Sequence, residues 1–460
     1  MRQLPAPVRF LVLATVALAT LATSCGDDTG ADDATPDNPT STDGAGDSSS
    51  TAPPDDTGGD TTTTMGDVER TASFRGVTPD AIKVGVVGPD LEALAGLVDL
   101  DHGSYEAAYR ALIDDINATG GVNGRRIDMV YDAFLPIGTE GMDTICSRFT
   151  EDEQVFAVLG GLLDDGPLCY TELSDTAFIG STQNDQRVER SSAPWFTGFR
   201  NSDDVVATTI RGFHERGVFD DAAVAVVAAV ADKSQVESIA LPLLDELGVD
   251  VVDVSFIEAS ALDTGASEAE AALIAERQKT AGADVALAIG GGTPSYAGGL
   301  EDSDFRPRLA TTSLSSLRAY IRDRGGRDLS LLEDSVAGNI AEQVGWWADP
   351  AIQDCIAIVE AAGEPTILDP NTRAPEEPEN IVSVAAACRD VALFVAIATA
   401  AGPELTNDSF RAAGEGLGDF HVPGFGPATY RADRPDGGAP IYFYEWDDEL
   451  QDLATDGTTL

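Results

Sequence analysis

Basic residues are scarce in this chain of 460 residues. Only 28 Lys and Arg stand against 79 Asp and Glu, which gives a formal net charge of -51 at pH 7. A surface of this sign repels the phosphates of nucleic acids and of anionic lipids, so we expect no nucleic-acid partner. We interpret the acidity as a solvated surface suited to salty surroundings rather than as a docking surface for one cationic partner.

Histidine is also rare. His102, His214 and His421 lie far apart in the sequence, and none belongs to a recognisable catalytic motif. Acid–base or nucleophilic catalysis needs a nucleophile paired with a base. The glycine run at 290–292 lacks the Lys that follows in a phosphate-binding loop. The sequence therefore predicts a protein that is not an enzyme and that uses no cofactor.

The N-terminal apolar run is too short to cross a membrane. Arg2 and Arg9 precede the run 10–21, whereas a transmembrane helix needs about 20 apolar residues. Small residues follow, up to Cys25, and this order is typical of a secretory signal peptide. The end of the segment resembles the lipobox of bacterial lipoproteins, in which the cysteine is acylated. We predict a signal peptide over residues 1–25, lipidation of Cys25, and a location in the cell envelope, attached to the membrane through the N-terminal lipid.

A polar segment follows the predicted lipidation site. From residue 26 to about residue 66 the chain is rich in Asp, Thr, Ser, Gly and Pro and contains no Lys or Arg. Such a composition buries too little apolar surface to offset the entropy lost on ordering. We predict a disordered acidic tether over residues 26–72 that holds a folded domain near a membrane.

Four cysteines remain after Cys25, and an even number in an exported protein indicates disulfides. Cys146, Cys169, Cys355 and Cys388 allow three pairings. We favour Cys146 with Cys169 and Cys355 with Cys388, because each pair closes a short loop. Metal binding is the alternative, but the chain has no CxxC spacing, and we expect no metal.

The folded part repeats an alternation of short β-branched runs and longer amphipathic stretches. The first unit has predicted strands at 82–87, 126–131 and 156–159, with a helix at 105–118. The second unit has predicted strands at 222–229, 249–256 and 285–289, with helices at 236–247 and 266–281. A long apolar helix at 381–401 and an aromatic strand at 441–446 follow. Strand–helix repeats predict α/β lobes with parallel sheets, and ligands of such sheets bind beyond the carboxyl ends of the strands.

Four segments carry a family resemblance. They are GVTPDAIKVG at 76–85, INATGGVNGRRI at 116–127, ADK at 231–233 and GFGPA at 424–428. Together they resemble the leucine/isoleucine/valine-binding family of type I periplasmic binding proteins, and the resemblance covers essentially all of the chain after about residue 73. The glycines of the second segment permit left-handed backbone angles, so this segment is a structural marker rather than a site.

The resemblance implies a two-lobed type I periplasmic-binding-protein fold, in which each lobe is a doubly wound parallel-sheet α/β sandwich and three chain crossovers form the hinge. We predict that 73–201 plus 338–418 form lobe 1 and that 202–337 plus 419–460 form lobe 2, with the polar region 183–204 as the first crossing. The family also commonly joins two cysteines that flank its fourth strand, as Cys146 and Cys169 do here.

The implied function is solute binding. Such a protein closes on an amino acid or similar small polar molecule by hinge motion and delivers it to the permease and ATPase subunits of an ABC importer. The alternative is a ligand-sensing receptor of the same fold that signals to a membrane partner, since closure is common to both functions.

The loops that follow the predicted strands supply the candidate ligand-binding residues. Ser181 and Thr182 rank first, because residues 179–182 resemble the family segment that grips a ligand carboxylate; capping of a turn is the structural alternative. Tyr296 could stack on an apolar part of the ligand or be a core residue. The complete set is Tyr105, Leu162, Asp164, Gly180, Ser181 and Thr182 in lobe 1, and Gln235, Gly291, Thr293 and Thr312 in lobe 2.

Two departures from the family affect the expected ligand. Asp164 and Asp165 stand where the family generally has small hydroxyl residues, and Val236 lies near a position that usually offers an aromatic residue. Two acids at a binding cleft would repel an anion. A cationic or neutral polar ligand is therefore as plausible from the sequence as a branched amino acid, unless these acids are solvated surface groups.

Overall fold

The computed structural model describes residues 70–94, 101–136, 141–260, 263–323, 326–374 and 377–460. The predicted signal peptide, Cys25 and most of the predicted tether lie outside the described residues. The last tether residues do not, because Arg70 Nη1 donates to the carbonyl of Gly124 at 2.7 Å and Arg125 Nη2 donates to that of Thr71 at 2.9 Å. These contacts attach residues 70–72 to the folded part of the chain.

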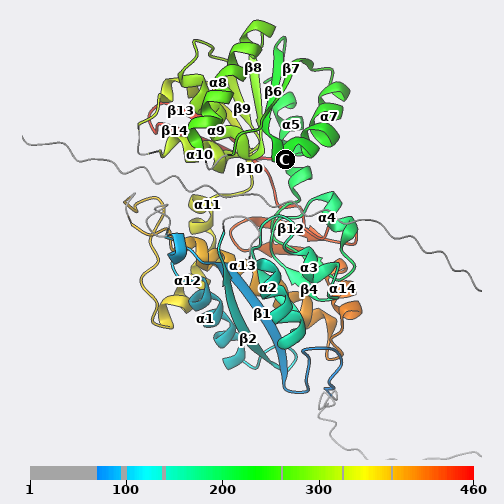
Figure 1. The fold of residues 1–460 in the computed structure, drawn as a ribbon. Helices are drawn as coiled ribbons and strands as arrows, with labels where there is room; N and C mark the ends of the chain where they lie inside the picture. Colours follow the sequence, from blue (N-terminus) through cyan, green and yellow to red (C-terminus); the bar gives the residue numbers. More distant parts are fainter. Residues whose placement is uncertain (1–69, 95–100, 137–140, 261–262, 324–325, 375–376) are drawn as a thin grey trace, which may run out of the picture. The chain divides into compact units, whose positions relative to one another are not determined.

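Five parallel strands form the first sheet, in the order β2-β1-β3-β4-β5. Strands β1 and β2 lie side by side in Figure 1. Along β1, Val84 and Val86 contribute to one core, whereas Val87 contributes to another. This alternation buries both faces of the sheet, which explains why its strands are almost continuously apolar. The strands are β1 (Ala81–Pro89), β2 (Arg126–Phe134), β3 (Ala157–Gly160), β4 (Ala177–Ile179) and β5 (Trp195–Phe196).

Helices α1, α12 and α13 contribute to the core that contains Val84 and Val86. Helix α1 begins where predicted, because the Ser104 hydroxyl accepts from the Ala107 amide at 3.1 Å and caps the first turn. Helix α13 is long and apolar enough to cross a membrane, but 72% of its most apolar window is buried in the protein, as in the core helix of a soluble domain. The helices of this part are α1 (Tyr105–Ala118), α2 (Met142–Ser147), α3 (Leu168–Thr171), α4 (Asp185–Arg190), α11 (Gln343–Ala348), α12 (Pro350–Ala361), α13 (Ile381–Ala401) and α14 (Asn407–Glu415).

The second sheet has seven strands in the order β14-β13-β10-β9-β8-β6-β7. Strands β6 to β10 are parallel, as predicted, but β13 and β14 are antiparallel. The turn between β13 and β14 is too short for the crossover that parallel pairing requires. The strands are β6 (Ala223–Ala229), β7 (Asp250–Ile257), β8 (Val285–Ile289), β9 (Arg308–Thr311), β10 (Val336–Asn339), β13 (Tyr442–Asp447) and β14 (Asp452–Thr459).

Helices cover both faces of the second sheet. Ala225 and Val227 of β6 contribute to one core, and Val224 and Val226 contribute to the other. The longer helices of this part are α5 (Ser202–Glu215), α7 (Leu241–Glu246), α8 (Thr264–Ala281), α9 (Thr293–Glu301) and α10 (Leu314–Ile321).

The chain passes between the part built on the first sheet and the part built on the second sheet more than once. The first crossing contains fewer residues than the predicted range 183–204. Trp195 and Phe196 pair with Phe178 and Ile179, so they belong to the first sheet and not to the crossing. Two paired residues make a strand too short for a sequence pattern to mark.

The third crossing concerns the C-terminal part of the chain. A hairpin of β11 (Gly418–Val422) and β12 (Gly426–Tyr430) places Val422 and Phe425 in the core of the first sheet, whereas Ile441 belongs to a core of the second. This favours a third crossing near residue 440, later than the lobe boundary predicted at residue 418.

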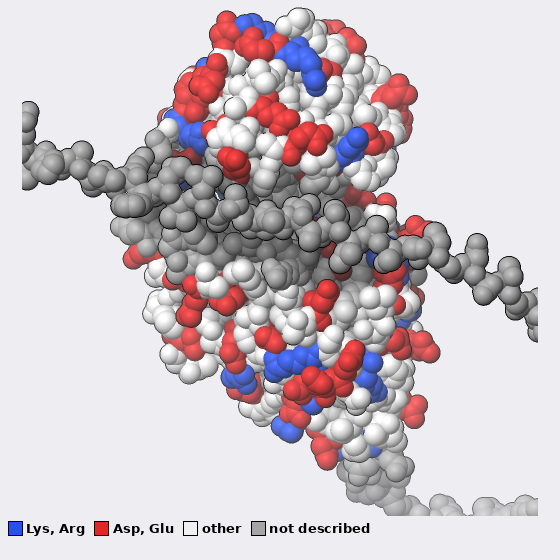
Figure 2. Space-filling view, in the orientation of Figure 1, with Lys and Arg blue, Asp and Glu red and all other residues white. Residues whose placement is uncertain are grey.

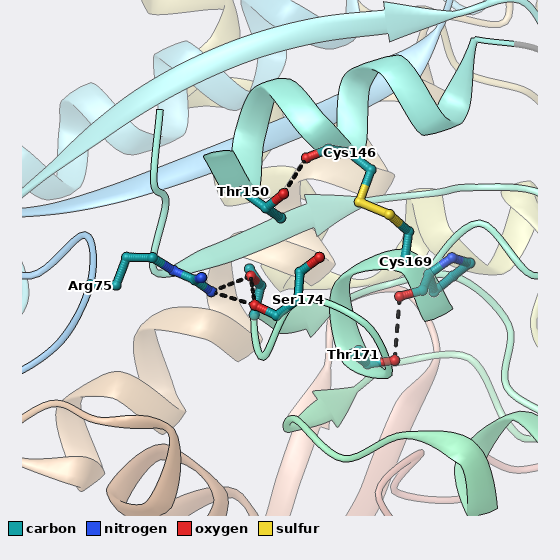
Figure 3. The surroundings of a disulfide bond; sticks show 8 residues. Arg75, Cys146, Thr150, Cys169, Thr171 and Ser174 are labelled. Carbon is teal, nitrogen blue, oxygen red and sulfur yellow. Dashed lines mark hydrogen bonds between the residues drawn. A yellow bond between two sulfur atoms is a disulfide. The ribbon is translucent and has the colours of Figure 1, made fainter. Parts of the chain in front are cut away.

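Two disulfides join neighbouring helices. Cys146 of α2 bonds to Cys169 of α3, and Cys355 of α12 bonds to Cys388 of α13, the pairing favoured from the sequence. Around the first disulfide, the Thr150 hydroxyl donates to the Cys146 carbonyl at 2.8 Å (Figure 3). The loops closed by the two bonds span 23 and 33 residues, and closing loops of this length stabilises a folded chain by about 3 kcal/mol each in the chain-entropy account.

Candidate functional site

The carboxyl ends of β3 and β4 lie against each other. Gly160 and Gly180 have φ values of +128° and +115°, and a Cβ atom on Gly180 would lie 2.3 Å from the Gly160 carbonyl oxygen. Only glycine fits at this approach. The Ser181 hydroxyl accepts from the Leu162 amide at 2.8 Å and connects the loops that follow the two strands.

The predicted first-lobe residues between 162 and 182 lie on these two loops with different exposures, whereas Tyr105 is the first residue of α1. Ser181 and Leu162 are buried, whereas Thr182 and Asp164 are exposed. Tyr105 is half-buried, its hydroxyl lies 2.9 Å from His102 Nδ1, and burial raises its pKa. The hydroxyl of Ser181 is occupied by a bond that braces the loops, and the role of Ser181 and Thr182 in ligand binding stays a prediction.

The two acids of the first loop do not form a free negative cluster. Asp165 accepts from Arg187 Nε at 2.9 Å and from Arg190 Nη1 at 2.8 Å, and Asp164 lies 3.9 Å from Arg187 Nη2. The hydrogen bond from Arg187 lowers the pKa of Asp165. Because α4 supplies compensating charge, these acids give no reason to prefer a cationic ligand.

The predicted second-lobe residues follow β6, β8 and β9, and most make hydrogen bonds within the protein. Gln235 Nε2 donates to Asp203 at 2.9 Å, and the Gly291 amide donates to Asp232 at 3.0 Å. Thr312 Oγ1 accepts from the Gly290 amide at 3.2 Å.

Two residues of α9 are buried more deeply than a ligand-binding role would require. Thr293 is completely buried, and its hydroxyl donates to the Gly290 carbonyl at 3.0 Å. Tyr296 is also completely buried, where its hydroxyl donates to Gln278 Oε1 at 2.5 Å. Tyr296 is therefore the core residue that the sequence allowed as an alternative to ligand stacking.

A cavity of about 480 Å³ is lined by residues that the sequence analysis did not single out. Its walls come from the first crossing, from the segment after β10, from α10 and α11, from the loop before α13, and from the β11–β12 turn. The lining residues are Phe199, Ser315, Arg318, Ala319, Arg322, Asn339, Ile340, Ala341, Glu342, Trp346, Pro370, Arg373, Glu379 and Phe425. None of the ten predicted ligand-binding residues belongs to this lining.

The cavity combines an aromatic wall with charged pairs. Arg318 pairs with Glu342 and also with Asp452, the latter at 2.9 Å. Arg373 Nη2 donates to Glu379 at 2.5 Å. Three arginines and two glutamates line the cavity, and one of the arginines, Arg318, also has Asp452 as a partner outside the lining.

An arginine lies directly behind the aromatic wall. The Arg389 guanidinium carbon is 4.2 Å from the ring centroid of Phe425, 4.8 Å from that of Trp346 and 5.3 Å from that of Phe199. All three rings line the cavity. Arg389 is 3% exposed, and its Nε and Nη1 have no hydrogen-bond partner among the described residues. Burial lowers the pKa of Arg389 to about 10, so the guanidinium stays charged at neutral pH.

The neighbouring Asp390 connects this arginine to the predicted loops. Tyr109 donates its hydroxyl proton to Asp390 Oδ2 at 2.5 Å, and a Cβ atom on Gly180 would lie 3.2 Å from the same oxygen. Burial raises the pKa of Asp390 to about 7 against the opposing effects of Tyr109 and Arg389. A charged pair inside the apolar helix 381–401 was the sequence signal that could have revealed this cluster, because buried charges usually have a functional or structural partner.

Comparison with known proteins supports the fold expected from the sequence. A sequence model described as periplasmic binding protein matches residues 81–452 of this chain. Among curated protein sequences, none matches it.

Solved structures match at low sequence identity. An ABC transporter substrate-binding protein from Desulfitobacterium hafniense, in complex with leucine, is 14% identical with a TM-score of 0.57, and the match covers 82% of this chain and 100% of that protein. A solute-binding protein from R. palustris, in complex with 4-hydroxybenzoate, is 15% identical with a TM-score of 0.57 and coverages of 83% and 96%. A branched-chain amino acid transporter protein from Streptococcus pneumoniae, in complex with isoleucine, is 14% identical with a TM-score of 0.55 and coverages of 83% and 100%. The predicted fold is confirmed.

Proposed function

The chain belongs to the periplasmic binding protein family, and on this basis we propose that it captures a small solute and delivers it to an ABC importer. The cavity of about 480 Å³ carries the proposal, because its lining combines two crossing segments with α10, which follows β9 of the second sheet, and with Trp346 of α11, which packs against a core of the first sheet. Crossing segments are the elements that bend in hinge closure. Movement at these segments would change the shape of the cavity and enclose a ligand.

The similar solved proteins support import as the purpose of binding. The three described above belong to ABC transporters, and they hold leucine, 4-hydroxybenzoate and isoleucine. Their ligands differ in shape and polarity, so the family alone leaves the ligand of this chain open. Ligand binding by Tyr105, Thr182 and the other predicted loop residues remains part of the proposal.

We also propose that the protein is extracytoplasmic and is attached to the membrane through a lipid on Cys25. The basic, apolar and small-residue order of residues 1–25 supports this proposal. Mass spectrometry of the mature N-terminal peptide tests it. The proposal requires a diacylated Cys25 as the first residue, and an unmodified peptide that begins elsewhere would contradict it.

A thermal-shift screen tests solute capture. A ligand that binds only the folded state stabilises it by about 2.7 kcal/mol when its concentration is a hundredfold above the Kd. We expect at least one solute in a set of amino acids, organic acids, amines and amides to raise the melting temperature in a saturable way. A set in which every solute leaves the melting temperature unchanged would argue against solute capture.

A further inference from the structure

Arginines are concentrated at the cavity of about 480 Å³. Acidic side chains are spread over the face shown in Figure 2, with basic side chains in small groups among them. The cavity lining departs from this pattern, because Arg318, Arg322 and Arg373 outnumber its two glutamates. An anion that avoids the acidic surface would be attracted here.

Two of the arginines at this place have donors that no described residue uses. The Nε atoms of Arg373 and Arg389 are buried without a hydrogen-bond partner, and so is Arg389 Nη1. Arg373 lines the cavity, whereas Arg389 lies behind the rings of the wall. A buried charged donor gains from a hydrogen-bond acceptor, so Arg373 Nε can serve a ligand in the cavity, whereas Arg389 contributes its charge from behind the rings.

The carboxylates that line this cavity are already paired with arginines, so a ligand ammonium group would have to compete for them. Its carboxylates are Glu342, which pairs with Arg318, and Glu379, which pairs with Arg373 and lies 3.8 Å from Arg322. A ligand ammonium would have to displace an arginine from one of these pairs. The cavity therefore disfavours amines and zwitterions electrostatically.

The rest of the wall is suited to a flat apolar group. Phe199, Trp346 and Phe425 line the cavity, and Phe425 lies 5.2 Å from Phe199 and 5.9 Å from Trp346 between ring centroids. A volume of about 480 Å³ falls within the range of small-molecule sites. Aromatic rings provide contact area at little cost in conformational entropy.

We infer that this cavity binds an organic anion, a carboxylate carried on a planar apolar body, with Arg373 as a direct hydrogen-bond donor and Arg389 as a positive charge behind the aromatic wall. The inference rests on the proposed function and adds the ligand class, which excludes free amino acids. Arg322, whose side chain is 57% exposed, adds a solvent-accessible positive charge to the lining.

The test compares four probes that share one phenyl body: phenylacetate, phenylacetamide, phenethylamine and phenylalanine. Titration calorimetry on the purified protein should give the order phenylacetate, phenylacetamide, then the two amines. Phenylalanine or phenethylamine binding more tightly than phenylacetate would overturn the inference but leave the proposed function standing. If none of these probes binds, the test uses the solute that gives the largest rise in melting temperature in the thermal-shift screen. An anionic solute supports the inference, and a cationic or zwitterionic solute overturns it. Absence of any binder in the screen counts against both.

Arg389→Met tests the charge behind the wall, with Arg389→Lys as the variant that keeps it. We expect Arg389→Met to weaken phenylacetate binding about 10-fold, because a positive charge near the bound carboxylate is lost, and to leave phenylacetamide unchanged. Arg389→Lys should retain most of the affinity. Arg110→Gln is the matched control, because Arg110 is an exposed arginine of α1 that pairs only with Glu106 among the described residues.

Stability separates this role from a structural one. Arg389→Met also removes the charge next to Asp390 and the contacts with three rings, so the melting temperature of the free protein is measured alongside the two affinities. Equal losses of affinity for the acid and the amide, together with a lowered melting temperature, would show that Arg389 only supports the fold and would overturn its assignment to the ligand.

Discussion

Replacing Phe410 with alanine is expected to lower the free energy of unfolding by about 3 to 5 kcal/mol. Phe410 of α14 is completely buried, and its ring centroid lies 5.5 Å from that of Phe156, 5.9 Å from that of Phe394 and 6.2 Å from that of Phe196. Truncation would leave a cavity where three other chain segments meet. Urea unfolding followed by circular dichroism and by fluorescence measures the loss.

Phe420→Ala is the matched control for this prediction. Phe420 is half-buried on β11 and contacts one ring, that of Tyr430, at 6.0 Å. Its truncation should cost less than about 2 kcal/mol, because less apolar surface returns to water. A loss for Phe410→Ala no larger than that for Phe420→Ala would show that α14 does not complete the core of the first sheet.

The second large effect concerns the pH dependence of Asp390. Burial raises the pKa of this carboxyl from its ordinary value to about 7, so the folded protein holds the proton more tightly than the unfolded chain. Stability is then lost as the pH rises from the unfolded pKa of about 3.9 to the folded pKa. The free energy involved is as much as about 4 kcal/mol, since each pKa unit corresponds to about 1.4 kcal/mol.

Asp390→Asn removes this titration and keeps an oxygen that can accept from Tyr109. We expect the stability of the variant, measured relative to the natural protein by urea unfolding, to rise from about pH 4 to about pH 7 and to level off above that pH. Asp165→Asn is the control with the opposite sign, because the hydrogen bond from Arg187 lowers the pKa of Asp165. Its substitution should lower the free energy of unfolding only slightly, and this loss should be larger at higher pH. A difference between Asp390→Asn and the natural protein that is constant over this range would contradict the predicted titration.

Much of the fold could be predicted from local patterns. The helix expected at 105–118 has these bounds in the structure, because Ser104 caps it and its apolar positions recur at helical spacing. The apolar runs at 82–87 and 285–289 are buried central strands of parallel sheets. Patterns of this kind depend on neighbours in the sequence, so they can be recognised without tertiary information.

Other parts of the fold could not be predicted, because they depend on contacts between distant residues. The two residues of β5 become a strand only through pairing with β4. The β11–β12 hairpin joins a core of the first sheet through Val422 and Phe425, whereas Ile441, which follows the hairpin, belongs to a core of the second sheet. No local sequence pattern shows whether a short hairpin will pack against the first sheet or against the second sheet.

The same contrast applies to the site. The loops around Gly160, Gly180 and Gly291 could be predicted, because topology places a loop at the carboxyl end of every parallel strand. The cavity lining could not, because Phe199, Arg373 and Phe425 come from segments far apart in the chain. Arg389 was the missed signal, since an arginine in an apolar helix requires a partner.

Titration calorimetry, with the solute that gives the largest rise in melting temperature, tests the central claim of solute capture most directly. The account predicts saturable heat, with one solute bound per chain, and weaker binding of that solute to the Arg389→Met variant. Heats of dilution alone for every solute that raises the melting temperature would contradict it.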